Sequence, residues 1–290
     1  MGLFNPNYDK PGKGVRKDEE RKKGAALYWE LFSRKWRSYI ALNLLYAVTC
    51  IPAYIFYFLV AAGLLPGQPT MQTMAISAMI AVFMVIFFAG SPFKSGFVYV
   101  IRNFVREEHA WTVADFFGKT KENLGQSIIA FFIDLVASTS FMFAIRFYAE
   151  MANSTQWITV FLCVVIVVMV MYAIMQSFVW SMMVTFQLKI GAIYKNSYLL
   201  SMATIPVNIL SIIIRVAATG LIFYANYLSY AIVIVVFFAA QALLEQMLAF
   251  PTIEKFMMVK SEENEESEQT EGVFNDYLEA VDDSEEEDDD

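Results

Sequence analysis

The sequence predicts an all-α membrane protein: a polytopic bundle of six transmembrane helices, with both termini cytoplasmic and amphipathic helices in the cytoplasmic loops. Three observations predict this fold class. They are six long apolar runs, a one-sided distribution of Lys and Arg between the runs, and amphipathic segments outside them. Hydrophobic residues make up 58% of the 290-residue chain, more than an ordinary water-soluble domain contains.

Each apolar run has at least about 20 residues, enough for a helix to cross roughly 30 Å of hydrocarbon. The runs cover residues 39–65, 70–91, 127–148, 157–186, 204–223 and 228–250. Strands of a membrane barrel would show short stretches of alternating hydrophobicity, whereas residues 161–172 are apolar on every face. We therefore expect helices, with the first run acting as an uncleaved anchor behind a long polar arm.

Lys and Arg fall on one side of this threading. Ten lie in residues 1–38, five between the second and third runs, two between the fourth and fifth, and two after the sixth. The segments 63–69, 149–156 and 224–227 on the opposite side have none. By the positive-inside rule, both termini are expected in the cytoplasm.

The chain divides into three parts: an N-terminal arm (1–38), a transmembrane domain (39–255) and an acidic tail (256–290). The arm ends in basic and aromatic residues, at 22–38, that are typical of a helix at an anionic membrane surface, and the plainest interpretation is an anchor for the first span. Residues 1–259 carry a formal charge of +7 and residues 260–290 carry −15, so we expect the tail to be largely disordered. Its Phe274, Tyr277 and Leu278 recur at helical spacing and are a motif that could fold on a partner.

A cytoplasmic loop between the second and third spans has the pattern of two amphipathic helices. Gly90-Ser91-Pro92 predicts a break, and Thr112 with Asp115 predicts the start of the second helix. Two interpretations stay open: the loop docks another membrane subunit, or it packs beneath its own bundle. The candidate docking residues are Phe97, Ile101, Phe104, Trp111, Phe116 and Phe117.

Charged residues inside the spans are candidate site residues, because an unpaired ion in hydrocarbon costs at least a few kcal/mol. Asp134 and Arg215 are expected at similar depths and predict an intramembrane polar pair, either a transport site or gate or a structural ion pair. Arg146 and Glu245 are expected near helix ends, where long side chains reach the headgroups.

Sequence motifs for catalysis are missing. The chain has no P-loop, dinucleotide-binding glycine pattern, nucleophile elbow or His-Glu-x-x-His, and Cys50 and Cys163 fall inside spans, where we expect them to be apolar packing residues. We expect no catalytic residue, metal site, cofactor or nucleic-acid partner.

Several ordered motifs resemble the YesL family of bacterial membrane proteins over about residues 3–255. They are the segment 4–15 (FNPNYDKPGKGV), 42–46 (LNLLY) followed by Ile51-Pro52, and 106–108 (REE) leading to 115–117 (DFF) and 121–123 (KEN). The family's members tend to be encoded beside carbohydrate ABC importers and polysaccharide-degrading enzymes of Gram-positive bacteria. The resemblance implies a bacterial cell-membrane location and a non-enzymatic accessory role, with the lipid bilayer and ABC permease subunits as partners. It implies no substrate, and the alternative function is a small transporter or channel using Asp134 and Arg215.

Overall fold

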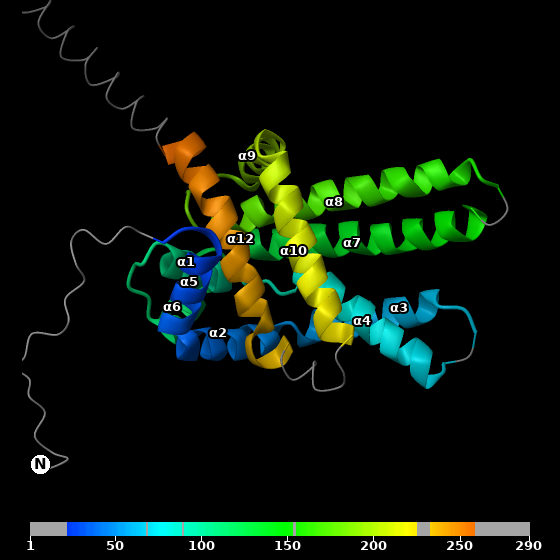
Figure 1. Cartoon of the computed structure of the whole chain (residues 1–290), viewed down its shortest axis with the longest axis horizontal. Helices are drawn as coiled ribbons and strands as arrows, with labels where there is room; N and C mark the ends of the chain where they lie inside the picture. Colours follow the sequence, from blue (N-terminus) through cyan, green and yellow to red (C-terminus); the bar gives the residue numbers. More distant parts are fainter. Residues whose placement is uncertain (1–21, 68, 89, 153–154, 225–232, 259–290) are drawn as a thin grey trace, which may run out of the picture.

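The computed structural model describes residues 22–67, 69–88, 90–152, 155–224 and 233–258, and over these residues the regular elements are all helices (Figure 1). The all-α class is confirmed. The segment 4–15 of the family resemblance and the tail motif Phe274, Tyr277 and Leu278 lie outside the described residues.

Three helical stretches are long and apolar enough to cross a membrane: α7 (Leu124–Ala152), α8 (Ile158–Met183) and the stretch Val235–Met258 around α12 (Phe238–Ile253). α12 is flanked by two π-helical turns, Val233–Phe237 (η1), whose last three residues belong to this stretch, and Glu254–Met258 (η2). The stretch therefore continues past residue 250, where the sequence predicts the sixth span to end.

Two bent pairs bring the number of candidate spans to five. α2 (Trp36–Thr49) and α3 (Ile51–Leu64) meet at 55°, and α9 (Ile190–Ala203) meets the beginning of α10 (Ile205–Tyr224) at 93°. Pro52, in the first turn of α3, has no N–H to continue the bonding of α2, which favours a break there. The structure thus supports three to five spans where the sequence predicts six.

The predicted second span is the shorter helix α4 (Met71–Phe87), which has 17 residues. It begins with a capping box in which the side chains of Thr70 and Thr73 each accept a hydrogen bond from the other's backbone N–H. The helix ends at Phe87, and the next helix, α5 (Lys94–Val105), begins at Lys94. The break predicted from Gly90-Ser91-Pro92 is therefore present.

The helices form two hairpins that point the same way. α3 with α4, and α7 with α8, extend toward the right-hand end in Figure 1, while α1 (Gly24–Arg34), α5 and α6 (Thr112–Glu122) lie at the other end. α10 and α12 run across these hairpins. The short connections after α3 and α7, which carry no Lys or Arg, thus lie at the end away from the basic elements.

The segment expected to be an amphipathic loop is the centre of the packed core. Every residue of α5 except Tyr99 is buried, and α5 packs against α2, α6, α8 and α12. Of the six candidate docking residues, four are buried within the chain: Phe97, Ile101, Phe104 and Phe116. Only Trp111 and Phe117 are exposed. These four side chains are therefore not free to dock a partner, which corrects that expectation in favour of packing within the bundle.

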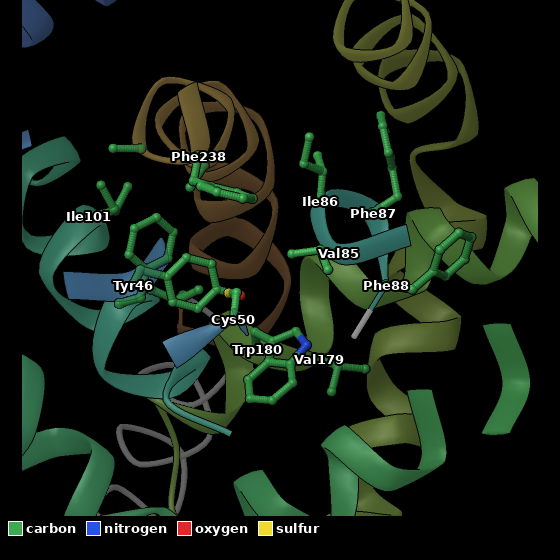
Figure 2. Packing of buried hydrophobic residues seen from close by; sticks show 14 of the residues in the cluster. Tyr46, Cys50, Val85, Ile86, Phe87, Phe88, Ile101, Val179, Trp180 and Phe238 are labelled. Atoms are coloured by element: carbon green, nitrogen blue, oxygen red, sulfur yellow. The ribbon is translucent and has the colours of Figure 1, made fainter. Parts of the chain in front are cut away.

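Close contacts explain how α5 and α6 hold together. A Cβ at Gly96 would overlap the carbonyl oxygen of Phe116, so only glycine allows this approach. α6 begins at Thr112, but its expected cap is made differently: the Asp115 carboxylate accepts a hydrogen bond from the Trp111 N–H at 2.8 Å. On the other side, the Tyr46 ring stacks on Phe97 at 4.2 Å, within the apolar cluster shown in Figure 2.

Candidate functional site

Five charged side chains are buried among the described residues. One of them, Arg102 of α5, bonds the connection between α8 and α9, and the other four come from four different helices. Lys94 of α5, Asp134 of α7, Arg215 of α10 and Glu245 of α12 are each less than 9% exposed. Burial of an ion is costly unless it is paired and hydrogen-bonded, so the surroundings of these groups determine what the interior can do.

Arg215 pairs with Glu245 rather than with Asp134. The Nη2 atom of Arg215 lies 3.1 Å from Oε2 of Glu245, with side chains that are 4% and 9% exposed. The Arg215 guanidinium also lies over the Phe87 ring, 4.9 Å from its centroid. This corrects two expectations: the Asp134–Arg215 pair is not formed, and Glu245 is an interior group rather than one that reaches the headgroups.

Asp134 is held by hydrogen bonds from two other helices. Its Oδ1 atom accepts from the Tyr172 hydroxyl at 2.7 Å, from Gln176 Nε2 at 2.5 Å, and from the Tyr194 hydroxyl at 3.5 Å. All three donors bind the same oxygen, and the other carboxyl oxygen, Oδ2, is buried with no hydrogen-bond partner among the described residues. Asp134 thus joins α7 to α8 and α9.

Lys94 is the first residue of α5 and is buried beside Arg215 and Glu245. Its ammonium is 5.3 Å from the centroid of the Trp180 ring, and it lines a cavity of about 20 Å³ together with Arg215, Gln241 and Glu245. Lys94 therefore lines the same cavity as the Arg215–Glu245 ion pair.

Lys94, Arg215, Asp134 and Glu245 are two bases and two acids, so their charges balance when all four are ionised. The small cavity has room for about one water molecule. Two buried atoms at its edge, Arg215 Nε and Gln241 Oε1, have no hydrogen-bond partner among the described residues, and water could satisfy both. Chemically, this arrangement can lock four helices in one register or carry a proton or an ion.

Other candidate residues lie apart from this network. Arg146 forms an ion pair with Glu150 one turn along α7, near the end of the helix, as its expected position near a helix end requires. Cys50 is buried, whereas Cys163 is exposed on α8, so only Cys50 is the packing residue expected from the sequence. Within the described residues, no group of three His, Cys, Asp or Glu side chains is placed to hold a metal ion.

Sequence reasoning missed Lys94 and misjudged Glu245. The sequence places Lys94 in a cytoplasmic loop, although a Lys two residues after Pro92, at a predicted helix break, is a usable signal. Glu245 counted as terminal because the sixth span was assumed to end at residue 250; measured from Met258, it lies about 20 Å along the helix.

Comparisons with protein-family models, with curated proteins and with solved structures found no match to this chain.

Proposed function

We propose that this chain is a non-enzymatic accessory subunit that binds the membrane-spanning helices of a carbohydrate ABC importer in the bacterial cell membrane. In this proposal it crosses the membrane six times, with both termini in the cytoplasm. The second crossing is made by α4 and completed by the first turn of α5.

The observation that carries the proposal is the outer half of the α7–α8 hairpin. This part extends away from the other helices in Figure 1, and the most apolar stretch of α8 is only 11% buried. Phe143 of α7 with Val164 and Val167 of α8 are among its exposed side chains. Helices associate in membranes through close packing of such surfaces, so this hairpin offers a long face to a partner helix.

The identity of the partner rests on the YesL-like motifs. Some members of those motifs are buried within the chain: Leu42, Asn43 and Tyr46 in α2, and Phe116 in α6. The 106–108 and 121–123 segments are mostly exposed. The buried members would then preserve the fold, while the apolar hairpin contacts the permease.

Copurification tests the proposal. A tagged full chain is recovered from its native host in mild detergent, and ABC permease subunits are quantified by mass spectrometry. Val164→Trp and Val167→Trp should each reduce permease recovery at least about tenfold, since a bulky ring on the face blocks close packing. Leu59→Trp is the matched control, because Leu59 is equally exposed but lies on α3. Failure to recover permease with the unmodified chain, or an equal loss in the control, would refute the proposal.

A second candidate function is a small transporter or channel, and one set of observations favours it. Transporter sites are often built at interrupted helices, and here the break before α5 and the sharp bend between α9 and α10 accompany Lys94, Asp134, Arg215 and Glu245. In this alternative, the cavity beside Lys94 is one step on a route for a proton or small ion.

Flux measurements separate the two functions. The chain is reconstituted alone in vesicles, and proton and ion fluxes are recorded for the unmodified chain and for Asp134→Asn. A transporter predicts a flux that Asp134→Asn abolishes while the helix content stays unchanged. A subunit that works only through a permease predicts no flux from either protein.

A further inference from the structure

A polar cavity at the basic end of the molecule is not used by the proposed function. It measures about 810 Å³ and lies between the start of α7 and the six-residue connection from α8 to α9. This volume is in the range of ordinary ligand pockets. Its lining includes Lys119, Glu122, Gln126, Thr185 and Lys189.

Two side chains from other helices fix the wall of this cavity. Arg102 Nη1 of α5 donates to the carbonyl oxygen of Val184 at 2.8 Å and to the Thr185 hydroxyl oxygen at 3.0 Å. Gln126 Nε2 of α7 donates to the carbonyl oxygen of Leu188 at 2.9 Å. The connection 184–189 is thus held near both ends by side chains of other helices, so the shape of the cavity is fixed by the fold.

The charge of the cavity favours an anion. Lys119 is 2.6 Å from Glu122, and this hydrogen bond raises the pKa of Lys119 above its ordinary value. Lys189 adds a positive charge that no acid among the described residues neutralises through an ion pair. Lys189 also stands at the N-terminus of α9, which no side chain caps, and the helix dipole there adds to the positive potential.

The position of the cavity favours an amphiphile over a free anion. The cavity lies beside the end of α8 and the beginning of α7, two candidate spans, and therefore where these helices leave the bilayer. From Gln126, exposed apolar side chains continue along α7 at helical spacing: Ile129, then Phe132 and Ile133. A phosphate in the cavity would thus have acyl chains along this stripe.

We propose that this cavity binds the headgroup of an anionic phospholipid, with Lys119 and Lys189 facing the phosphate and the exposed stripe of α7 contacting an acyl chain. Basic pockets between membrane helices on the cytoplasmic side are suited to such lipids. The site does not depend on an ABC permease and goes beyond the proposed function.

The test uses the full chain purified in detergent and equilibrated with mixed micelles of phosphatidylglycerol and phosphatidylcholine that have the same acyl chains. Native mass spectrometry counts the retained lipids. Because one basic residue near an anionic surface contributes about 1 kcal/mol, the double variant Lys119→Gln/Lys189→Gln should lower the retained ratio of phosphatidylglycerol to phosphatidylcholine roughly tenfold or more. A thermal melt checks that the variant is folded.

Two further variants keep the test decisive. Lys121→Gln/Lys195→Gln removes the same charge from exposed lysines of α6 and α9 that do not line the cavity, and it should leave the ratio within about twofold. Gly125→Phe should fill the cavity, because nothing lies within 4 Å of a Cβ there, and it should lower phosphatidylglycerol retention with no change of charge.

Three results would overturn the proposal. An equal loss in both lysine double variants would indicate diffuse surface charge, and displacement of the lipid by millimolar inorganic phosphate would indicate a free-anion site. Binding of phosphatidylglycerol only after deletion of residues 261–290 would make the acidic tail the occupant.

Discussion

In water-soluble proteins apolar side chains are mostly buried and charged side chains are mostly exposed, whereas α5 and α8 show the opposite arrangement. α8 is the most apolar of the three long candidate spans, yet only 11% of its most apolar stretch is buried; in the stretch around α12, which is the least apolar of the three, the figure is 61%. α5 carries Lys94, Arg102 and Asn103 and is buried on nearly every side. In a membrane, lipid takes the apolar surface, and polar groups bring helices together inside.

The comparison implies that the interior should be sensitive to single charges. Glu245→Leu leaves the Arg215 guanidinium buried without its carboxylate and should lower the free energy of unfolding by about 3–5 kcal/mol. Unfolding in mixed detergent micelles, followed by circular dichroism, measures the change. The double variant Arg215→Leu/Glu245→Leu should recover most of the loss; a double variant less stable than either single variant would contradict pairing.

The next largest effect is expected at the contact between α5 and α6. Gly96→Ala places a methyl group against the Phe116 backbone and should cost about 3 kcal/mol, since neither helix can move without disturbing the core. Gly118→Ala, on α6 with open space around its Cβ, should instead stabilise the helix by up to about 1 kcal/mol. The same unfolding assay checks both, and similar effects at the two glycines would show that α5 and α6 are not in close contact.

A smaller effect is expected where α5 supports the α8–α9 connection. Arg102→Met removes the hydrogen bonds to Val184 and Thr185 and should cost about 2 kcal/mol. Arg106→Met is the control four residues along, because the Arg106–Glu108 ion pair is partly exposed and should contribute less than about 1 kcal/mol. An equal loss at the two arginines would mean that burial of α5 does not extend to its C-terminal half.

The sequence predicts the positions of the helices along the chain better than it predicts which helices pack against one another. Apolar length locates α7 and α8, and Gly90-Ser91-Pro92 locates the break before α5. The bend at Cys50 lies within the predicted span 39–65, and the bend at Thr204 separates the predicted span 204–223 from α9. The angles of both bends depend on tertiary packing rather than on local propensity. The sequence of α5 also looks amphipathic, but its polar residues Lys94, Arg102 and Asn103 are buried inside the bundle and are not exposed to water.

Partners of the buried charges were equally difficult to predict. Asp134 and Arg215 were matched by depth alone, but depth places a residue along a helix and does not say which helix lies beside it. Once α10 is known to pack against α12, Glu245 becomes the nearer partner for Arg215. Oδ1 of Asp134 instead accepts hydrogen bonds from neutral donors, Tyr172 and Gln176, which a search for opposite charges overlooks.

The smallest predicted effects compare the two environments within one helix. Val179 is fully buried in the inner half of α8, whereas Val167 in the outer half is 60% exposed. Val179→Ala should cost about 1–2 kcal/mol through lost packing, and Val167→Ala less than about 0.5 kcal/mol, when each is measured on the isolated chain in detergent. If a partner covers the outer half, the Val167 substitution should become costly only in the copurified complex. Equal effects in the isolated chain would mean that the two halves of α8 have the same surroundings.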